Sequence, residues 1–268
     1  MGNPLPGCRI TLVAAAFFVA ALAVASAQGL EQGESAPVRE VVDGDTLVLA
    51  RPIDGATKVR LVGIQAPKLP LGRAGFRAWP LAEEARQALV ELAQGRELTL
   101  SFGGASKDRY GRLLAHLHDP AGTWIQGEML RRGMTRVYSF ADNRAVVAEM
   151  LALEREARQA GRGVWNDPFY AIRTPEEASR HLGSFQIVEA TVLAATRKQG
   201  RIYLNFGPDW RTDFTAAIGT SARTLFVRQG LDPLDLAGRR IRLRGWIARF
   251  NGPLIEVTHP EQIEVLGE

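Results

Sequence analysis

The chain has 268 residues, of which 46% are hydrophobic and 23% are charged. This composition is typical of a globular protein and excludes a disordered one. The formal net charge of +4 at pH 7 is too small to indicate nucleic-acid binding through overall charge alone. The chain contains one cysteine, Cys8, so a framework of disulfides within the chain is excluded.

The first 27 residues are typical of a secretory signal peptide. Arg9 precedes an apolar run over Thr11–Val24, and Ala25-Ser26-Ala27 supplies the small residues of a cleavage site. We expect cleavage before Gln28 and an exported protein, periplasmic or secreted, with no stable membrane association afterwards. A retained N-terminal anchor is the alternative, because the run approaches the ~20 residues that a spanning helix needs.

Residues 37–168 carry the pattern of one domain. Short β-rich segments at hairpin spacing, a helix, two more strands and two helices are expected in this order: Val38–Val42, Thr46–Ala50, Lys58–Ile64, Pro80–Gly95, Arg96–Phe102, Leu113–Asp119, a short helix between Thr123 and Gly133, and Asn143–Ala160. Three strands, a helix and two strands is the order of a five-stranded OB-type barrel. The fold class predicted is therefore mainly β with α additions (α+β).

A connecting stretch at 169–183 is bordered by Asp167-Pro168 and contains Thr174-Pro175, and a second domain is predicted at 184–268. Its expected strands and its one helix are, in chain order, Phe185–Ala195, Arg201–Gly207, Arg211–Ile218, Ser221–Gln229 (the helix), Arg239–Ile247 and Pro253–Thr258. The order again predicts an OB-like β-barrel.

Acidic and basic residues suited to phosphodiester chemistry occur in the first domain. Asp43 and Asp45 belong to an Asp-Gly-Asp-Thr turn, and Arg60 and Arg112 follow later. Carboxylate oxygens hold divalent cations, and planar guanidinium groups bind phosphate oxygens in pairs. Taken alone, the Asp-Gly-Asp-Thr segment is more typical of an ordinary hairpin turn.

The ordered set of motifs resembles the thermonuclease (staphylococcal-nuclease-like) family over roughly residues 37 to 167. The motifs are Val42–Thr46, Val59–Ile64, Lys107–Leu113 and Ala160–Trp165. The resemblance implies an OB-type barrel, Ca²⁺ as cofactor, and hydrolysis of phosphodiester bonds in DNA and RNA.

The same resemblance implies a role for each matching residue. Asp45 matches a calcium ligand, and Asp43 matches an acidic neighbour of the metal. Arg60 and Arg112 match the two arginines that hold the phosphate and stabilise the transition state. Nucleic acid is therefore the expected substrate or ligand.

Two positions depart from the family's pattern. Gln65 stands where the resemblance implies a second metal carboxylate, and Ala66 follows at a position that binds through its backbone carbonyl. Lys68 stands where the family has the glutamate that activates water. A lysine with its usual pKa near ~10.4 is protonated at neutral pH and cannot accept that proton.

Three outcomes are open for Lys68. The protein is a slower or altered nuclease, with water activated by metal alone or by Glu83 or Glu84. Alternatively, Lys68 folds back onto Asp43 and Asp45 and leaves a nucleic-acid or polyanion-binding module, or the site is a structural relic. Because both phosphate arginines are present, an altered nuclease is favoured over the binding module. A cell-envelope interaction scaffold is the third class of function.

Two further sets of residues have competing interpretations. His116 and His118 share one face of a strand, and partly exposed strand histidines are favoured over a metal pair because no third ligand is evident. Aromatic residues and an arginine in the second domain could stack unpaired bases, but aromatic side chains that fill the barrel core are favoured: Tyr203, Phe206, Trp210, Arg211 and Phe214.

Alternation along one predicted strand puts three arginines, Arg240, Arg242 and Arg244, on one face. A solvated outer face is favoured here over a stripe that follows a nucleic-acid backbone.

Overall fold

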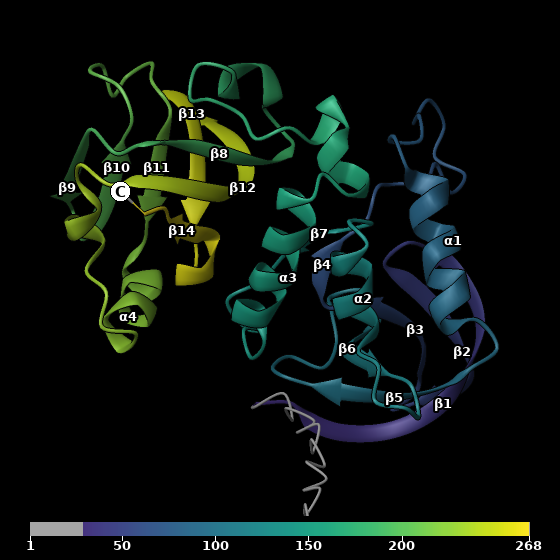
Figure 1. Ribbon diagram of the computed structural model, residues 1–268. Coiled ribbons are helices and arrows are strands. Elements are labelled where there is room, and N and C mark those ends of the chain that lie inside the picture. The colour runs from purple at the N-terminus through teal and green to yellow at the C-terminus, as the bar shows by residue number, and fades with distance from the viewer. Residues whose placement is uncertain (1–28, 268) are drawn as a thin grey trace, which may run out of the picture.

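The computed structural model describes residues 29–267 and consists of two β-barrels with helix α3 between them (Figure 1). The predicted signal peptide lies outside the described residues. Within the described range, no helix combines the length and the apolar character needed to cross a membrane.

The first barrel is closed, as the sequence predicted. Its strands are β1 (Glu31–Asp43), β2 (Thr46–Ile53), β3 (Ala56–Leu61), β5 (Glu97–Phe102) and β6 (Leu113–His118). They pair in the order β1-β2-β3-β6-β5, and the β3–β6 pair is parallel. Strand β1 closes the ring because its first half pairs with β5 and its second half with β2.

Three helices and a small two-stranded sheet cover this barrel. They are α1 (Ala82–Ala93), α2 (Ile125–Arg131), α3 (Val147–Gln159), β4 (Gly63–Gln65) and β7 (Arg136–Tyr138). The strand expected over Lys58–Ile64 is broken at Val62, because Gly63 adopts a positive φ of 83° and the chain leaves the barrel to pair with β7. Strand β7 was not predicted, because its three residues are too few for a periodic pattern.

The second sheet contains β8 (Phe185–Thr191), β9 (Ala194–Lys198), β10 (Arg201–Asn205), β11 (Thr215–Ile218), β12 (Arg240–Phe250), β13 (Gly252–Val257) and β14 (Ile263–Val265). Helix α4 (Thr220–Arg228) lies between β11 and β12. Short 3₁₀ helices complete the secondary structure: η1 (Gly163–Asn166), η2 (Pro168–Tyr170), η3 (Ala178–His181), η4 (Pro233–Leu236) and η5 (Pro260–Gln262).

This second sheet repeats the strand order of the first. It runs β9-β10-β11-β13-β12, with β11 and β13 parallel, and β8 pairs with the free edge of β12. The chain passes from β8 to β9 at Val192 and Leu193, whose N–H groups donate to Arg239 and Asn205. Segments β8 and β9 therefore act as one bent first strand, and the OB-like barrel that was predicted is confirmed.

The arginines of β12 do not form a solvated face. Arg240 is exposed, Arg242 is half-buried on Glu189, and Arg244 is fully buried. The Arg244 guanidinium donates to both carboxylate oxygens of Glu154 on α3, at 2.9 and 3.1 Å, and also to Glu264. The expectation failed because the strand alternation shows which residues share a face, and the position of α3 decides how much of that face is covered.

Two other expectations need correction. His116 is buried, not partly exposed, with its ring centroid 5.6 Å from that of Trp124, and burial lowers its pKa to about 3. In the aromatic cluster, Phe214 lies in the core with Phe206 against it, whereas Trp210 is half exposed. The two interpretations of this cluster thus apply to different members.

Candidate functional site

The Asp-Gly-Asp-Thr segment forms the tight turn between β1 and β2. The Asp45 backbone N–H donates to the Asp43 side chain at 3.1 Å, which fixes the turn. Gly44 is required here, because a Cβ atom at this position would lie 2.7 Å from the Cβ of Ala66 and 2.9 Å from that of Ala85. The close approach brings the start of α1 and the segment after β4 onto the two aspartates.

Asp45 is fully buried and its carboxylate is surrounded by donors. Its Oδ2 accepts from the backbone N–H of Ala66 at 2.7 Å and from Lys68 Nζ at 2.6 Å, and it lies 3.3 Å from Arg60 Nη2. Burial opposes ionisation, but Arg60 and Lys68 outweigh it and hold the Asp45 pKa well below its usual range. Lys68 has therefore folded back onto Asp43 and Asp45, which we call the acidic pair.

Asp43 is the second member of the pair. Its Oδ2 lies 3.8 Å from Lys68 Nζ. Burial and the neighbouring charge of Asp45 raise the Asp43 pKa, and Lys68 opposes this only in part. One ammonium group is thus shared unequally by two buried carboxyl groups.

Gln65 points away from the two aspartates. Its Oε1 accepts from Arg136 Nη2 at 3.1 Å. A calcium ion needs six to eight oxygen ligands, and the described residues contain no group of three acidic, histidine or cysteine side chains placed to hold a metal. Because an ammonium group also contacts the most buried carboxylate, these residues do not fit the Ca²⁺ that the resemblance implied.

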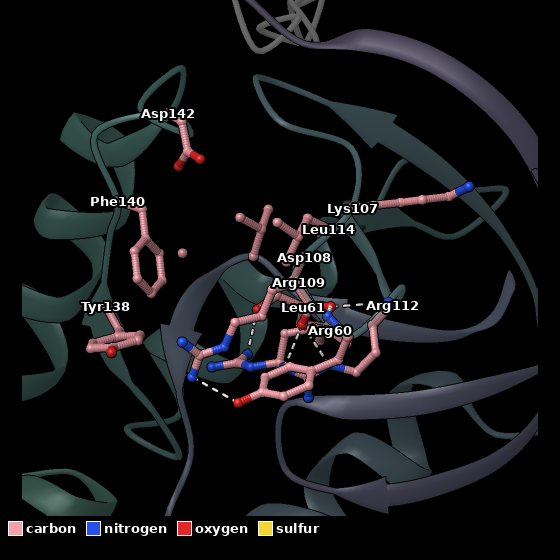
Figure 2. A pocket seen from close by; sticks show the side chains of 13 residues that line it. Arg60, Leu61, Lys107, Asp108, Arg109, Arg112, Leu114, Tyr138, Phe140 and Asp142 are labelled. Atoms are coloured by element: carbon pink, nitrogen blue, oxygen red, sulfur yellow. Dashed lines mark hydrogen bonds and ion pairs between the residues drawn. The ribbon is translucent and has the colours of Figure 1, made fainter.

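The two arginines meet in a pocket of about 560 Å³, which we call the arginine pocket (Figure 2). Arg60 reaches it from β3, and its guanidinium is held by the carbonyl oxygens of Leu61 and Ile64, each at 2.6 Å. Arg112 comes from the loop before β6, where the Asp108 carboxylate binds it at 2.6 Å. Lys68, Asp43 and Asp45 do not line the pocket, and Arg60 joins it to the acidic pair.

The opposite wall of the arginine pocket was not predicted. Tyr138, Phe140 and Asp142 face the arginines across it (Figure 2). Tyr138 and Phe140 alternate along β7 and just beyond it, and this period of two was the available signal. By contrast, neither Glu83 nor Glu84 lines the pocket, and Glu83 is paired with Arg86.

The comparison with protein families matches residues 58–167 to the model described as "Staphylococcal nuclease homologue". The matched segment contains Arg60, Gln65, Lys68 and Arg112, and the acidic pair precedes it.

Individual relatives agree with this match. "Endonuclease YhcR" of Bacillus subtilis is 31% identical over 158 residues, which are 57% of this chain and 13% of that protein. "Protein ParB" of Escherichia coli is 36% identical over 169 residues, 59% of this chain and 85% of that protein. "Thermonuclease" of Staphylococcus intermedius is 25% identical over 140 residues, 50% of this chain and 77% of that protein. With a matching family model, a closed OB-type barrel and a relative covered over most of its length, the chain belongs to the staphylococcal nuclease homologue family.

Proposed function

We propose that the protein is a nuclease that binds a nucleic-acid phosphodiester in the arginine pocket and cleaves it there. The reaction does not need a Ca²⁺ ion bound to Asp43 and Asp45. The relatives named endonuclease and thermonuclease support a nuclease-type function. The observation that carries the altered metal requirement is the 2.6 Å contact between Lys68 Nζ and Asp45. It places an ammonium group against the carboxylate that would otherwise hold a cation.

The two arginines supply the phosphate contacts in this proposal. Arg112 and Arg60 bind non-bridging phosphate oxygens and stabilise the charge that grows on them as water attacks phosphorus and one P–O ester bond breaks, with the leaving sugar oxygen taking a proton from solvent. Both are already oriented, Arg60 by backbone carbonyls and Arg112 by Asp108, so little ordering is needed when substrate binds.

Asp142 is the residue we assign to water activation. It is exposed, stands on the wall opposite the arginines, and makes no ion pair with any described residue (Figure 2). A carboxylate in this position accepts a proton from a water molecule held between it and the phosphate. Asp108 cannot take this role, because Arg112 binds it and the backbone N–H groups of Tyr110 and Arg112 hold it further.

A phosphodiester-binding module without hydrolysis is the second candidate. It is favoured by the commitment of Asp45 to four donors, which leaves the acidic pair without a role in catalysis.

Cleavage assays separate the two candidates. Purified protein is incubated with single-stranded and duplex DNA in Ca²⁺ or in EDTA, and products are resolved on gels. We expect equal cleavage in both buffers, a loss of roughly 10²–10³-fold for Arg112→Ala, and a loss of roughly 10²–10⁴-fold for Asp142→Asn. Asp235→Asn, an exposed aspartate in the second domain, is the matched control and retains full activity.

Two outcomes would count against the proposed metal-independent nuclease. If EDTA abolishes cleavage, the metal-independent reaction is wrong. If no cleavage occurs but a fluorescent oligonucleotide binds and Arg112→Ala weakens that binding, the binding module replaces the nuclease.

We also propose export of the mature chain, on the pattern of residues 1–27. Mass spectrometry of the protein recovered from cell fractions tests this. A mature N-terminus at Gln28 outside the cytoplasm supports export, and an intact N-terminus in the cytoplasm contradicts it.

A further inference from the structure

A second pocket, of about 430 Å³, lies on the outside of the second barrel, and we call it the outer pocket. Tyr203 of β10, Trp210 of the β10–β11 loop and Phe250 at the end of β12 line it. Trp210 is 50% exposed and Phe250 is 63% exposed. Exposed rings gathered at one pocket mark an interaction site more often than single scattered ones do.

The outer pocket lies where OB barrels bind extended ligands. In this fold, the face of the second and third strands binds the ligand, together with the loops between strands one and two and between strands four and five. Strands β10 and β11 are the second and third here. Gln199 lies in the first of those loops and Asn251 in the other, and both line the outer pocket.

Shared and paired lining residues link the arginine pocket to the outer pocket. Tyr138 and Phe140 line both the arginine pocket and a pocket of about 290 Å³ between the domains. Trp246 and Ala248 of β12 line that interdomain pocket from the other side. Ala248 lies directly opposite Leu254 in the β12–β13 pairing, and Leu254 lines the outer pocket.

The charges at the outer pocket favour a polyanion. Lys198 Nζ lies 5.7 Å from the ring centroid of Trp210 and makes no ion pair with the residues that the structure describes. The Arg211 guanidinium lies 4.7 Å from the same ring and forms an ion pair of 3.9 Å with Asp209. An uncharged oligosaccharide stacks on rings as well, but it gains nothing from the two cations.

We propose that the outer face of the second barrel binds single-stranded nucleic acid whose neighbouring segment occupies the arginine pocket. The proposal rests on the proposed function, which puts a phosphodiester in that pocket. The strand passes Tyr138 and Trp246 along β12, and unpaired bases stack on Phe250 and Trp210 while Lys198 faces the backbone. A duplex cannot bind this way, because its bases are already stacked on one another.

Binding of oligothymidylates of two lengths to the full chain tests the surface. Fluorescence anisotropy is measured with phosphorothioate-linked strands, a dinucleotide that fits the arginine pocket alone and a strand of about twelve nucleotides, within the range that one OB barrel covers. We expect Trp210→Ala and Phe250→Ala each to weaken binding of the longer strand by roughly 5- to 100-fold. Binding of the dinucleotide stays unchanged. Val227→Ala, which removes an exposed apolar side chain from α4, is the control and alters neither.

The salt dependence gives a second readout that does not depend on stacking. For single strands, each phosphate contact contributes about −0.7 to the slope of log K against log salt concentration. Lys198→Gln should therefore make the slope for the longer strand shallower by about 0.7. An unchanged slope would remove Lys198 from the proposed surface.

The outcomes distinguish failure of this inference from failure of the proposed function. If Arg112→Ala weakens both strands but the outer-face variants weaken neither, the outer face is not a nucleic-acid surface and the arginine pocket remains one. If the outer-face variants weaken the longer strand and Arg112→Ala changes nothing, the surface stands and the proposed function falls. Binding of maltohexaose or chitohexaose at the outer pocket, with no binding of either DNA strand, would overturn the choice of ligand.

Discussion

Lys68 is the residue that most separates this site from the family's pattern. A flexible ammonium group reaches Asp45 at 2.6 Å and Asp43 at 3.8 Å, and its side chain stays only about one-fifth exposed. Removing it would leave two buried carboxyl groups with Arg60 as their single cationic partner among the described residues. A buried pair that loses one partner is strongly destabilised, because the remaining charge stays out of water.

Restoring an acidic residue at position 68 tests this account. Lys68→Glu replaces the ammonium by a third carboxylate, so we expect the free energy of unfolding in EDTA to fall by about 3–5 kcal/mol. The same variant should gain thermal stability when Ca²⁺ is added, whereas the wild type should not, because only the variant has ligands to spare for a cation. Thermal unfolding with Ca²⁺ and with EDTA measures both effects.

Lys58→Glu makes the same charge change on an exposed residue of β3 and serves as the control. A wild-type protein that Ca²⁺ stabilises as strongly as the variant would contradict the assignment of Lys68.

At the scale of elements, β12 connects the two domains. Its three alternating arginines run from Arg240, which is exposed to solvent, to Arg244, which is buried. Glu154 of α3 and Glu264 of β14 bind the Arg244 guanidinium. Burial opposes the charge of Arg244, yet the two carboxylates outweigh it and raise its pKa. The Trp246 side chain, two residues on, donates to the Tyr138 hydroxyl at 2.8 Å and brings the second barrel to the edge of the arginine pocket.

The same substitution at the two ends of the series should give very different results. Arg244→Met removes the buried guanidinium between Glu154 and Glu264, leaves them only the half-buried Arg158 as a shared partner among the described residues, and should lower the free energy of unfolding by about 3–5 kcal/mol. Arg240→Met, on the same strand and exposed, should change it by no more than about 0.5 kcal/mol. Urea unfolding at pH 7 measures both. Equal effects of the two variants would show that the buried cluster does not hold the domains together.

At the scale of the whole molecule, two barrels of the same strand order are joined by polar contacts that titrate. His259 of the second domain shares a hydrogen bond of 2.7 Å with Ser139 of the first, and Arg144 forms a two-point ion pair with Glu261 nearby. Burial lowers the His259 pKa to about 4. Protonation of the His259 ring would therefore destabilise the contact between the two domains.

The sign of the pH effect follows from this lowered pKa. An unfolded chain protonates His259 near pH 6.5, and the folded protein does so only near pH 4, so the free energy of unfolding decreases as the pH falls between these values. For His259→Gln, we expect the loss of stability between pH 7 and pH 5 to be smaller by about 2 kcal/mol than in the wild type. Urea unfolding at the two pH values tests it, and an identical loss in both proteins would contradict it. His116 adds to the loss in both proteins, because its pKa is lowered in the same direction.

Local patterns were enough to predict the barrels. Alternation, turn residues and helical spacing act over a few positions, so β1 to β3, α1 and the strand order of both domains could be read from neighbouring residues. The Asp-Gly-Asp-Thr turn and the motifs of Arg60 and Arg112 were also visible, because their spacing along the chain is short and ordered. That Lys68 lies near Asp45 was one of three predicted outcomes.

Contacts between distant segments were decided only by packing. Arg244 meets Glu154 across 90 positions, Gln65 meets Arg136 across 71, and Trp246 meets Tyr138 across 108. No local pattern predicts which face of a sheet a second domain will cover. Strand alternation determines the side of the sheet on which a side chain lies, but not what packs against that side. The contact between Lys68 and Asp45 likewise depends on packing. The Gly44 turn lies close to Ala66, and this brings the Asp45 carboxylate and the Lys68 ammonium group together.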